Sequence, residues 1–445
     1  MKTGRFGESI TYIGPDGNFQ DTLADHVRDN GFTGFSPEGI TSYLTFRHPI
    51  GSLTMFERIE KVPFGHEVHE NHVRPYWTPR FSTAHPPLDE AVHHVDELLQ
   101  ASIRQCVQGR EHLGVTVSGG VDSSLLVAVL RSLFPDREIR TYSAGFYGDD
   151  EFEYSRLVAQ HFDTRHTEFI LGPDEYIGKD SLLRPLIRFK ASPLHPNEIA
   201  LAEAEKRARA DGCDIVLCGE GSDDIFGGYG QNFRMYLDYD FTEPFFAFFL
   251  KHYRYFSNDD RRIVKPDFLR DDHALTLHHL NVRELDHDMR NWVLYLTQVL
   301  HTPGLITRGA NAMRFNGFPL GFPYIDTDLV DYTNSLPFEY KVRWKSDADR
   351  ISAADLSFRE VSERHDTPKY ILKKVAEKYL DEQIIYRPKK GFPVPFEEWF
   401  GQLTTLDLDT DIFLSRDVSA YRAWTKFMLM NLNVFIQEFK PYIRS

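Results

Sequence analysis

The chain has 445 residues, 41% of them hydrophobic and 26% charged, and its 66 acidic side chains outnumber 51 basic ones, which gives a formal charge of −15. At roughly 100 to 200 residues per domain, this is enough for more than one globular domain, and the composition excludes collagen, coiled coil or disorder as the main architecture. Phosphate binding needs a basic surface, so the negative charge makes nucleic acid an unlikely partner. Small-molecule or peptide chemistry is favoured instead.

The cysteine content and the absence of long apolar runs indicate the cellular compartment of the protein. Cys106, Cys213 and Cys218 are the three cysteines, and their spacing indicates neither a disulfide framework nor a structural zinc site. The first residues lack the apolar core of a signal peptide, and no run reaches the roughly 20 apolar residues that cross a bilayer. We therefore expect a cytoplasmic protein that does not enter a membrane.

In chain order, the first feature is a small N-terminal element. Residues 36–78 carry short apolar and aromatic runs between turn signals, which predicts a β-rich structure, and the prolines within residues 80–87 indicate a linker. Apolar residues recur every three or four positions from Leu88 onward, which predicts a helix. We place the domain boundary there, so that residues 1–85 form a small element and residues 86–445 a larger domain.

The larger domain begins with strands that alternate with helices. This order predicts an α/β fold with a parallel sheet covered on both faces. From about Tyr229 the apolar patterns are helical with few strand signals, so a mostly helical C-terminal extension is expected. The predicted strands are residues 113–118, 137–146, 166–171 and 214–219, and the predicted helices are residues 123–134, 151–162 and 199–210.

The segment Ser118-Gly119-Gly120-Val121-Asp122-Ser123-Ser124 joins a predicted strand to a predicted helix. Its glycines permit a tight turn, and the turn's N–H groups, the helix start and the hydroxyls together form a cradle for an anion. The lysine of a GxxxxGK[ST] loop is missing, and the Asp122 carboxylate would repel a phosphate unless a divalent cation lay between them. The motif therefore predicts Mg²⁺ with a polyphosphate, the alternative being an ordinary glycine-rich turn with a serine cap.

A second glycine-rich segment, GEGSDDIFGGYG (219–230), follows the last predicted strand. Glu220, Asp223 and Asp224 lie among its glycines, which would bring the backbone close to a ligand. A position at the carboxyl end of a parallel strand favours a binding site. An exposed turn or a calcium-binding loop remains the alternative.

Taken together, these motifs resemble the asparagine synthetase family, the ATP pyrophosphatase-type amide synthetases that include β-lactam synthetases and lasso-peptide cyclases. SGGVDSS is similar to the family's pyrophosphate loop, GEGSDDIFGGYG to its second acidic loop, and TYSAGFYGDDEFEYSRLVAQHFDTRHTEFIL to its adenine-side strand and helix. FPYIDTDLVDYTNSLPFEYKV and YRPKKGFPVPFEEWF resemble its C-terminal half. The resemblance covers residues 85 to 400 approximately and implies a PP-loop fold, with the N-terminal element a truncated remnant.

The resemblance implies a two-step reaction. A substrate carboxylate attacks the α-phosphorus of ATP, pyrophosphate leaves with Mg²⁺, and an amine or ammonia then displaces AMP. By position, Asp122 and Asp223 would hold Mg²⁺, Glu220 would assist attack by the nitrogen, and Lys389 would contact the α-phosphate and the developing oxyanion. A salt-bridged loop residue is the alternative for Glu220, and a solvated basic turn for Lys389. The nucleotide-binding residues implied are Thr116, Ser118, Gly119, Gly120, Asp122, Ser123, Ser124, Ala144, Cys218 and Gly219.

Two departures from the family pattern bear on the substrate. Members with a glutaminase domain carry a catalytic cysteine after the initiator Met, whereas this chain has Lys2 and no cysteine before Cys106. Residues 1–85 resemble only the tail of that domain, so we expect no glutamine hydrolysis. Pro319 and Gly321 stand where the family usually has Glu and Arg, which predicts substrates other than aspartate and ammonia.

The leading hypothesis is therefore an AMP-forming amide synthetase of a specialised or natural-product pathway, with a homodimer left open. It would join a small-molecule or peptide carboxylate to an amine or ammonia. Intramolecular closure of a lactam or macrolactam remains an alternative within the same chemistry. From other classes come a tRNA-modifying enzyme that adenylates a base, which the acidic charge disfavours, and a silent binding protein, which the clustered carboxylates disfavour. For His195, a role on the substrate side of the site and packing in the core are both left as alternatives.

Overall fold

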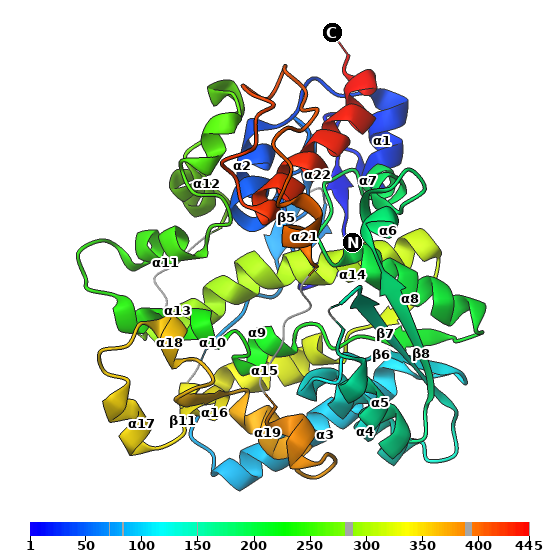
Figure 1. Ribbon diagram of the computed structural model, residues 1–445, viewed down its shortest axis with the longest axis vertical. Coiled ribbons are helices and arrows are strands. Elements are labelled where there is room, and N and C mark those ends of the chain that lie inside the picture. The colour runs from blue at the N-terminus through cyan, green and yellow to red at the C-terminus, as the bar shows by residue number, and fades with distance from the viewer. Residues whose placement is uncertain (71, 82–83, 149, 281–287, 388–393, 445) are drawn as a thin grey trace.

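A five-stranded parallel sheet forms the centre of the larger domain (Figure 1). The computed structural model describes residues 1–70, 72–81, 84–148, 150–280, 288–387 and 394–444. The strand order is β10-β9-β6-β7-β8, so that β6 lies between β9 and β7. The strands are β6 (Leu113–Thr116), β7 (Ile139–Phe146), β8 (Arg165–Leu171), β9 (Ile215–Leu217) and β10 (Leu320–Gly321).

The helices that follow these strands or precede the sheet are α3 (Leu88–Cys106), α4 (Val121–Leu133), α5 (Phe152–His161), α6 (Pro173–Ile177), α7 (Leu183–Lys190) and α8 (Glu198–Ala210). The alternating pattern predicted the first four strands and the helices α3, α4, α5 and α8, whereas the shorter α6 and α7 were not predicted. In Figure 1, α4 and α5 lie below the sheet, whereas α8 and the long α14 lie together above it. Strand β10 was not predicted, because two residues are too short to show an alternating pattern. The predicted α/β class is confirmed.

The second half of the chain is mostly helical, as expected. Its helices are α9 (Ser222–Phe226), α10 (Gly230–Phe233), α11 (Phe245–Tyr253), α12 (Asp272–His279), α13 (Met289–Leu296), α14 (Thr302–Asn316), α15 (Thr327–Ser335), α16 (Phe338–Lys341), α17 (Asp347–Ser352), α18 (Phe358–Val361), α19 (Tyr370–Ala376), α20 (Glu382–Ile385), α21 (Phe396–Phe400) and α22 (Ala423–Phe439). A short antiparallel pair, β11 (Val342–Trp344) with β12 (Asp366–Pro368), lies among them. Within the described ranges, no helix is long and apolar enough to cross a membrane.

The N-terminal segment contains short strands, as predicted, and also two helices that were not. The strands are β1 (Tyr12–Ile13), β2 (Phe19–Gln20), β3 (Glu60–Lys61), β4 (His66–His69) and β5 (His72–Pro75), and the helices are α1 (Leu23–Asn30) and α2 (Pro37–Phe46). The start of α2 could have been recognised in the sequence. The Ser36 hydroxyl accepts a hydrogen bond from the Gly39 N–H at 3.0 Å, and Pro37 occupies the first turn.

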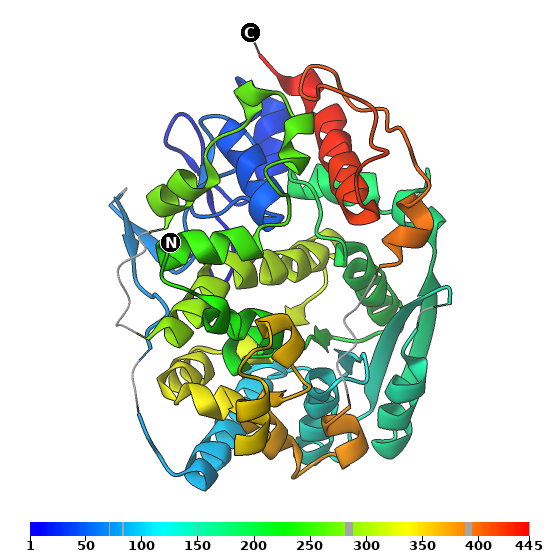
Figure 2. The ribbon, with the colours of Figure 1, turned by 60° about the vertical axis from the view of Figure 1, so that its left-hand side comes forward.

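The N-terminal segment lies beside the C-terminal helix α22 (Figure 2), and aromatic rings pack between them. The ring centroids of Phe56 and Phe435 are 5.5 Å apart, and those of Phe56 and Phe439 are 5.3 Å apart. Tyr43 in α2 donates a hydrogen bond to the Met428 carbonyl at 3.2 Å. One hydrophobic core therefore includes side chains from both predicted domains. The boundary near residue 85 stays a prediction.

Truncation of Phe56 should destabilise the whole protein. Its side chain is only 2% exposed and packs against rings from both ends of the chain, so Phe56→Ala should cost about 3–5 kcal/mol of unfolding free energy, because the cavity remains partly unfilled. Denaturant unfolding measures this. Phe241→Ala is the control, because Phe241 is 73% exposed and its loss should change the free energy by less than about 0.5 kcal/mol. Equal effects of the two substitutions would contradict the assigned packing.

Candidate functional site

The loop between β6 and α4 is held in a tight turn by its own side chains. Gly119 has φ 70°, and a Cβ there would lie 2.4 Å from the Tyr154 Cβ, so only glycine fits. The Ser118 N–H donates to the Ser123 hydroxyl at 3.1 Å. Helix α4 begins directly after the loop at Val121. The loop therefore directs backbone N–H groups and a helix N-terminus toward one place.

The loop after β9 meets this first loop at the same edge of the sheet. Strands β6 and β9 are parallel neighbours, so their carboxyl ends lie side by side. Ser222 donates a hydrogen bond to Asp122 Oδ1 at 2.6 Å, and the Tyr324 hydroxyl donates to the Asp122 carbonyl at 2.9 Å. The two motifs, about 100 residues apart in the sequence, thus form one site.

Lys369 links the carboxylates of the two loops. Its Nζ contacts the Asp122 carboxylate and lies 2.7 Å from Asp223 Oδ1, and its side chain is 5% exposed. Burial alone would lower the pKa of Lys369, but the two carboxylates raise it above its ordinary value, so the ammonium stays charged. A Cβ at Gly228 would lie 1.9 Å from Asp223 Oδ1 and 2.1 Å from Lys369 Cε, which explains the glycine at this position.

A pocket beside the first loop carries further positive charge. Arg387 donates to the Ser118 carbonyl at 3.2 Å and pairs with Glu151 at 2.7 Å. Burial, together with the nearby Lys369, lowers the pKa of Lys373 to about 8. Three basic side chains around an N–H-rich loop suit an anion with several oxygens. The pocket is lined by Ser118, Gly120, Val121, Asp122, Gly228, Glu363, Pro368, Lys369, Lys373, Ile384, Ile385 and Arg387.

Several of the predicted nucleotide-binding residues line the same sheet edge. The Thr116 hydroxyl donates to the Leu217 carbonyl at 3.4 Å, and a Cβ on Gly219 would lie 3.5 Å from the Asp122 Cβ. Cys218 is buried, and burial raises the pKa of its thiol to about 12, so the thiol is not a nucleophile.

Two further predicted residues lie deeper. Ala144 is half-buried within β7, next to β6 in the sheet. Ser124 is fully buried in α4, so its hydroxyl does not reach the pocket surface. A role for either residue in nucleotide binding stays a prediction.

Glu220 is oriented by a buried arginine that the motifs did not reveal. Its carboxylate contacts the Arg308 guanidinium, whose NH1 lies 2.9 Å from His195 Nδ1. Burial, and then the charge on Arg308, lower the pKa of His195 well below its ordinary value, so the ring is neutral and accepts the hydrogen bond. His195 therefore contacts the site through Arg308. The salt bridge to Arg308 does not exclude a catalytic role for Glu220, so both predicted alternatives stay open.

The carboxylate pair fits the predicted magnesium ion. Asp122 and Asp223 already share one cation, and Mg²⁺ in proteins is commonly held by one or two carboxylates plus substrate phosphates. In the ranges the structure describes, no cluster of three or more His, Cys, Asp or Glu side chains could hold a metal by itself. Phosphate oxygens would therefore have to complete the coordination.

Two further sequence expectations concern Lys389 and Gly321. Lys389 belongs to residues 388–393, which lie outside the described residues. Gly321 is in β10, where an added Cβ would lie 2.6 Å from Leu217 Cδ2 and 3.4 Å from Cys106 Cβ. A longer side chain has no room there without repacking of the strand, so the glycine suits the packing as well as the altered substrate that was predicted.

The fold and site define a class: an α/β protein with a glycine-rich strand-to-helix loop and a carboxylate pair at the carboxyl edge of its sheet. The sequence pattern of the asparagine synthase family matches residues 94–430, and the chain belongs to this family. It is 25% identical over 320 residues to the "Putative asparagine synthetase [glutamine-hydrolyzing] 1" of Methanocaldococcus jannaschii, covering 68% of this chain and 49% of that protein.

Other relatives agree in family and differ in length. The "Asparagine synthetase [glutamine-hydrolyzing] 1" of Bacillus subtilis is 22% identical over 420 residues, which cover 81% of this chain and 60% of that protein. The chain thus spans half to three-fifths of the length of these curated relatives. Among solved structures, an NH3-dependent NAD synthetase from Campylobacter jejuni aligns with 32% of this chain and 61% of its own at a TM-score of 0.22 and 10% identity.

Removal of the Lys369 ammonium should leave two carboxylates facing each other without a cation. Because loss of one partner from a buried ion pair is costly, Lys369→Met should lower the unfolding free energy by about 3 kcal/mol. Lys374→Met in α19, the helix that follows Lys369, is the control, since its pair with Glu377 is about one-third exposed and should matter by less than about 0.5 kcal/mol. Denaturant unfolding without Mg²⁺ compares them, and similar losses would contradict the bridging role.

Proposed function

We propose that this protein is an ATP-dependent amide-bond synthetase that adenylates a substrate carboxylate and transfers the acyl group to an amine or ammonia. The observation that carries the proposal is the pocket where the Ser118–Ser124 loop, the Asp122 and Asp223 carboxylates and the basic side chains Lys369, Lys373 and Arg387 converge. Membership of the asparagine synthase family supports the same reaction.

In the proposed adenylation step, the chain's residues bind and neutralise the leaving pyrophosphate. The backbone N–H groups of the loop, the start of α4 and the three basic side chains would hold its oxygens, which stabilises charge as it develops. Asp122 and Asp223 would hold Mg²⁺, which neutralises charge on the phosphates. Lys389 is proposed to contact the α-phosphate. Thr116, Ala144, Cys218 and Gly219 are proposed to surround the adenosine.

In the proposed second step, Glu220 accepts a proton from the attacking nitrogen. Its carboxylate lies at the edge of the site and is held by the buried Arg308, so its direction is fixed before substrate arrives. An ammonium ion attacks only after it has lost a proton, and a neutral amine loses one as the amide forms, so in either case a positioned carboxylate supplies the acceptor. The nitrogen would come as an amine or free ammonia.

The direct test follows pyrophosphate and AMP release with ATP, Mg²⁺, a panel of small and peptide carboxylates, and amines, ammonia or glutamine as the nitrogen source. We expect release that depends on both carboxylate and nitrogen. A linear substrate that loses water without an added amine would reveal intramolecular ring closure. Release that requires tRNA would refute the proposal in favour of base adenylation, and ATP binding without release would favour a binding protein.

Asp122→Asn should abolish pyrophosphate formation. The substitution removes one carboxylate of the predicted Mg²⁺ site while retaining the shape of the side chain, and we expect a loss of about 10³-fold or more. A pyrophosphate-coupled assay measures it. Asp240→Asn in an exposed surface loop is the control and should retain normal turnover. Turnover in Asp122→Asn that is within threefold of the parent would contradict the metal role.

Glu220→Gln should separate the two half-reactions. Loss of a general base typically costs a factor of about 10² to 10⁴, so amide formation should fall by that factor, whereas carboxylate-dependent exchange of pyrophosphate into ATP should fall less than about tenfold. Rapid-quench measurement of adenylate and amide follows both steps. Equal losses in exchange and amide formation would show that Glu220 only maintains the loop through Arg308.

A further inference from the structure

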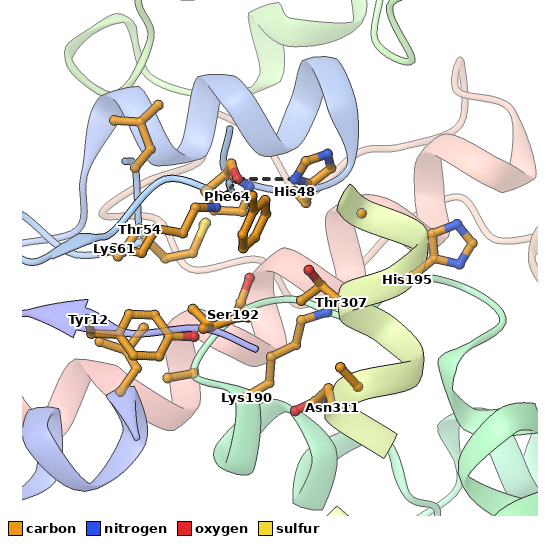
Figure 3. Close-up of a pocket in the computed structure, with 18 of the residues that line it drawn as sticks. Tyr12, His48, Thr54, Lys61, Phe64, Lys190, Ser192, His195, Thr307 and Asn311 are labelled. Carbon is orange, nitrogen blue, oxygen red and sulfur yellow. Dashed lines mark hydrogen bonds between the residues drawn. The ribbon is translucent and has the colours of Figure 1, made fainter. Parts of the chain in front are cut away.

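A second cavity lies away from the phosphate pocket, between the N-terminal segment and helices α7 and α14 (Figure 3). Its volume is about 90 Å³, and it shares no lining residue with the pocket beside Ser118. The N-terminal wall includes Tyr12, His48 and Lys61, and the opposite wall includes Lys190 and Asn311. At roughly 10–15 Å³ per water, this is room for about six to nine non-hydrogen atoms.

The charged groups around this cavity are mostly basic. Arg47, Lys61, Lys190 and Arg314 line it, against a single carboxylate, Asp21. Lys190 is neutralised by Glu198 at 2.8 Å. Within the part of the chain that the structure describes, Arg47, Lys61 and Arg314 form no ion pair. This imbalance occurs in a chain whose formal charge is −15, so a shortage of carboxylates does not explain it.

Among these basic groups, Lys61 is a buried one that has no carboxylate partner in the described ranges. Its residue is 7% exposed, and its Nζ donates to the Pro49 carbonyl at 2.5 Å and lies 5.1 Å from the centre of the Phe64 ring. An ammonium has three donors, and burial without an opposite charge is costly. Burial, and then the charge on Lys190, lower the pKa of Lys61 to about 7. An anion in the cavity would supply what this side chain lacks.

The rest of the lining suits an apolar body. Phe46, Leu53, Met55 and Leu305 are buried side chains that contribute to the walls. Phe189, also in the lining, is 38% exposed, so the cavity reaches the surface there. A ligand for this cavity therefore combines one negative group with a short hydrocarbon chain.

We propose that this cavity binds a small organic acid, with its carboxylate paired to Lys61 and its hydrocarbon part against the apolar wall. The proposal goes beyond the amide synthetase function, because the cavity is separate from the phosphate pocket and needs no ATP to bind. The two sites nonetheless share a connection. His195 lines the cavity and bonds Arg308, which holds Glu220, so one hydrogen bond joins the cavity wall to the group that positions the proposed base.

The test measures binding of three- to six-carbon monocarboxylates without ATP, by isothermal titration calorimetry and thermal shift. We expect at least one acid to bind and inorganic phosphate to bind more weakly. Lys61→Met should weaken binding of that acid about tenfold or more, because it removes a charged hydrogen-bond partner. Lys61→Arg should restore part of the affinity.

Lys341→Met is the matched control. Lys341 is likewise fully buried, donates to one carbonyl (Leu336, 2.6 Å) and has a pKa lowered to about 7 by burial, but it does not line the cavity. Its substitution should leave acid binding unchanged. A general effect of removing a buried lysine would appear in both variants, and a specific one only in Lys61→Met.

Two outcomes would overturn the proposal: no acid in the panel binds the parent protein, or Lys61→Met binds as tightly as Lys341→Met. If Lys61→Met does not fold, Arg314→Gln serves instead, since Arg314 is half-buried in the α14 wall of the same cavity, and it should weaken binding severalfold. Mass spectrometry after incubation with ATP, Mg²⁺ and ammonia distinguishes a consumed substrate from an unchanged effector. Failure of the synthetase assay would leave the ATP-free binding result intact.

Discussion

The contact of Lys369 with Asp122 and Asp223 is the interaction on which the site depends. Its three members come from the start of α4, the start of α9 and the residue before α19. The two carboxylates contact the same ammonium and repel each other, and a buried ammonium without an opposite charge is costly. Each of the three groups is therefore stabilised by the other two. The interaction therefore holds the helical C-terminal half against the sheet at the point where the loops meet.

Backbone geometry decides which side chains can take part in that interaction. Parallel pairing of β6 with β9 places two loops at one edge, and close contacts at Gly119 and Gly228 leave no space for a side chain. A larger residue at Gly228 would displace Asp223 and Lys369 themselves. The glycines are thus as necessary for the charge arrangement as the charged residues are.

The sequence allowed prediction of the α/β class and of four of the five sheet strands, because these follow from local periodicity. A joint role for the two glycine-rich loops was implied by the family resemblance, and the parallel pairing of β6 with β9 shows how they meet. The sequence did not single out Lys369 or Arg308. Lys369 lies in a segment with several lysines, and only tertiary contacts distinguish it. Arg308 lies in a helix whose apolar pattern gives no indication of a buried charge. The helix α2 was also missed, although the Ser36-Pro37 start was visible, because the surrounding aromatic runs favoured strands.

The two pockets differ in how far carboxylates balance their basic side chains. The chain as a whole is acidic, so its average field does not attract an anion, and attraction within either proposed binding pocket would have to come from the basic side chains concentrated there. In the phosphate pocket, those basic groups are balanced by Asp122 and Asp223. In the cavity beside Lys61 the balance is absent.

The partners of Glu220 lie between these two environments: Arg308 is neutralised on one side by the carboxylate, and on the other it bonds a neutral His195 that lines the cavity. A change of charge on the cavity side therefore acts on Arg308 through one hydrogen bond, and Arg308 in turn fixes the direction of Glu220.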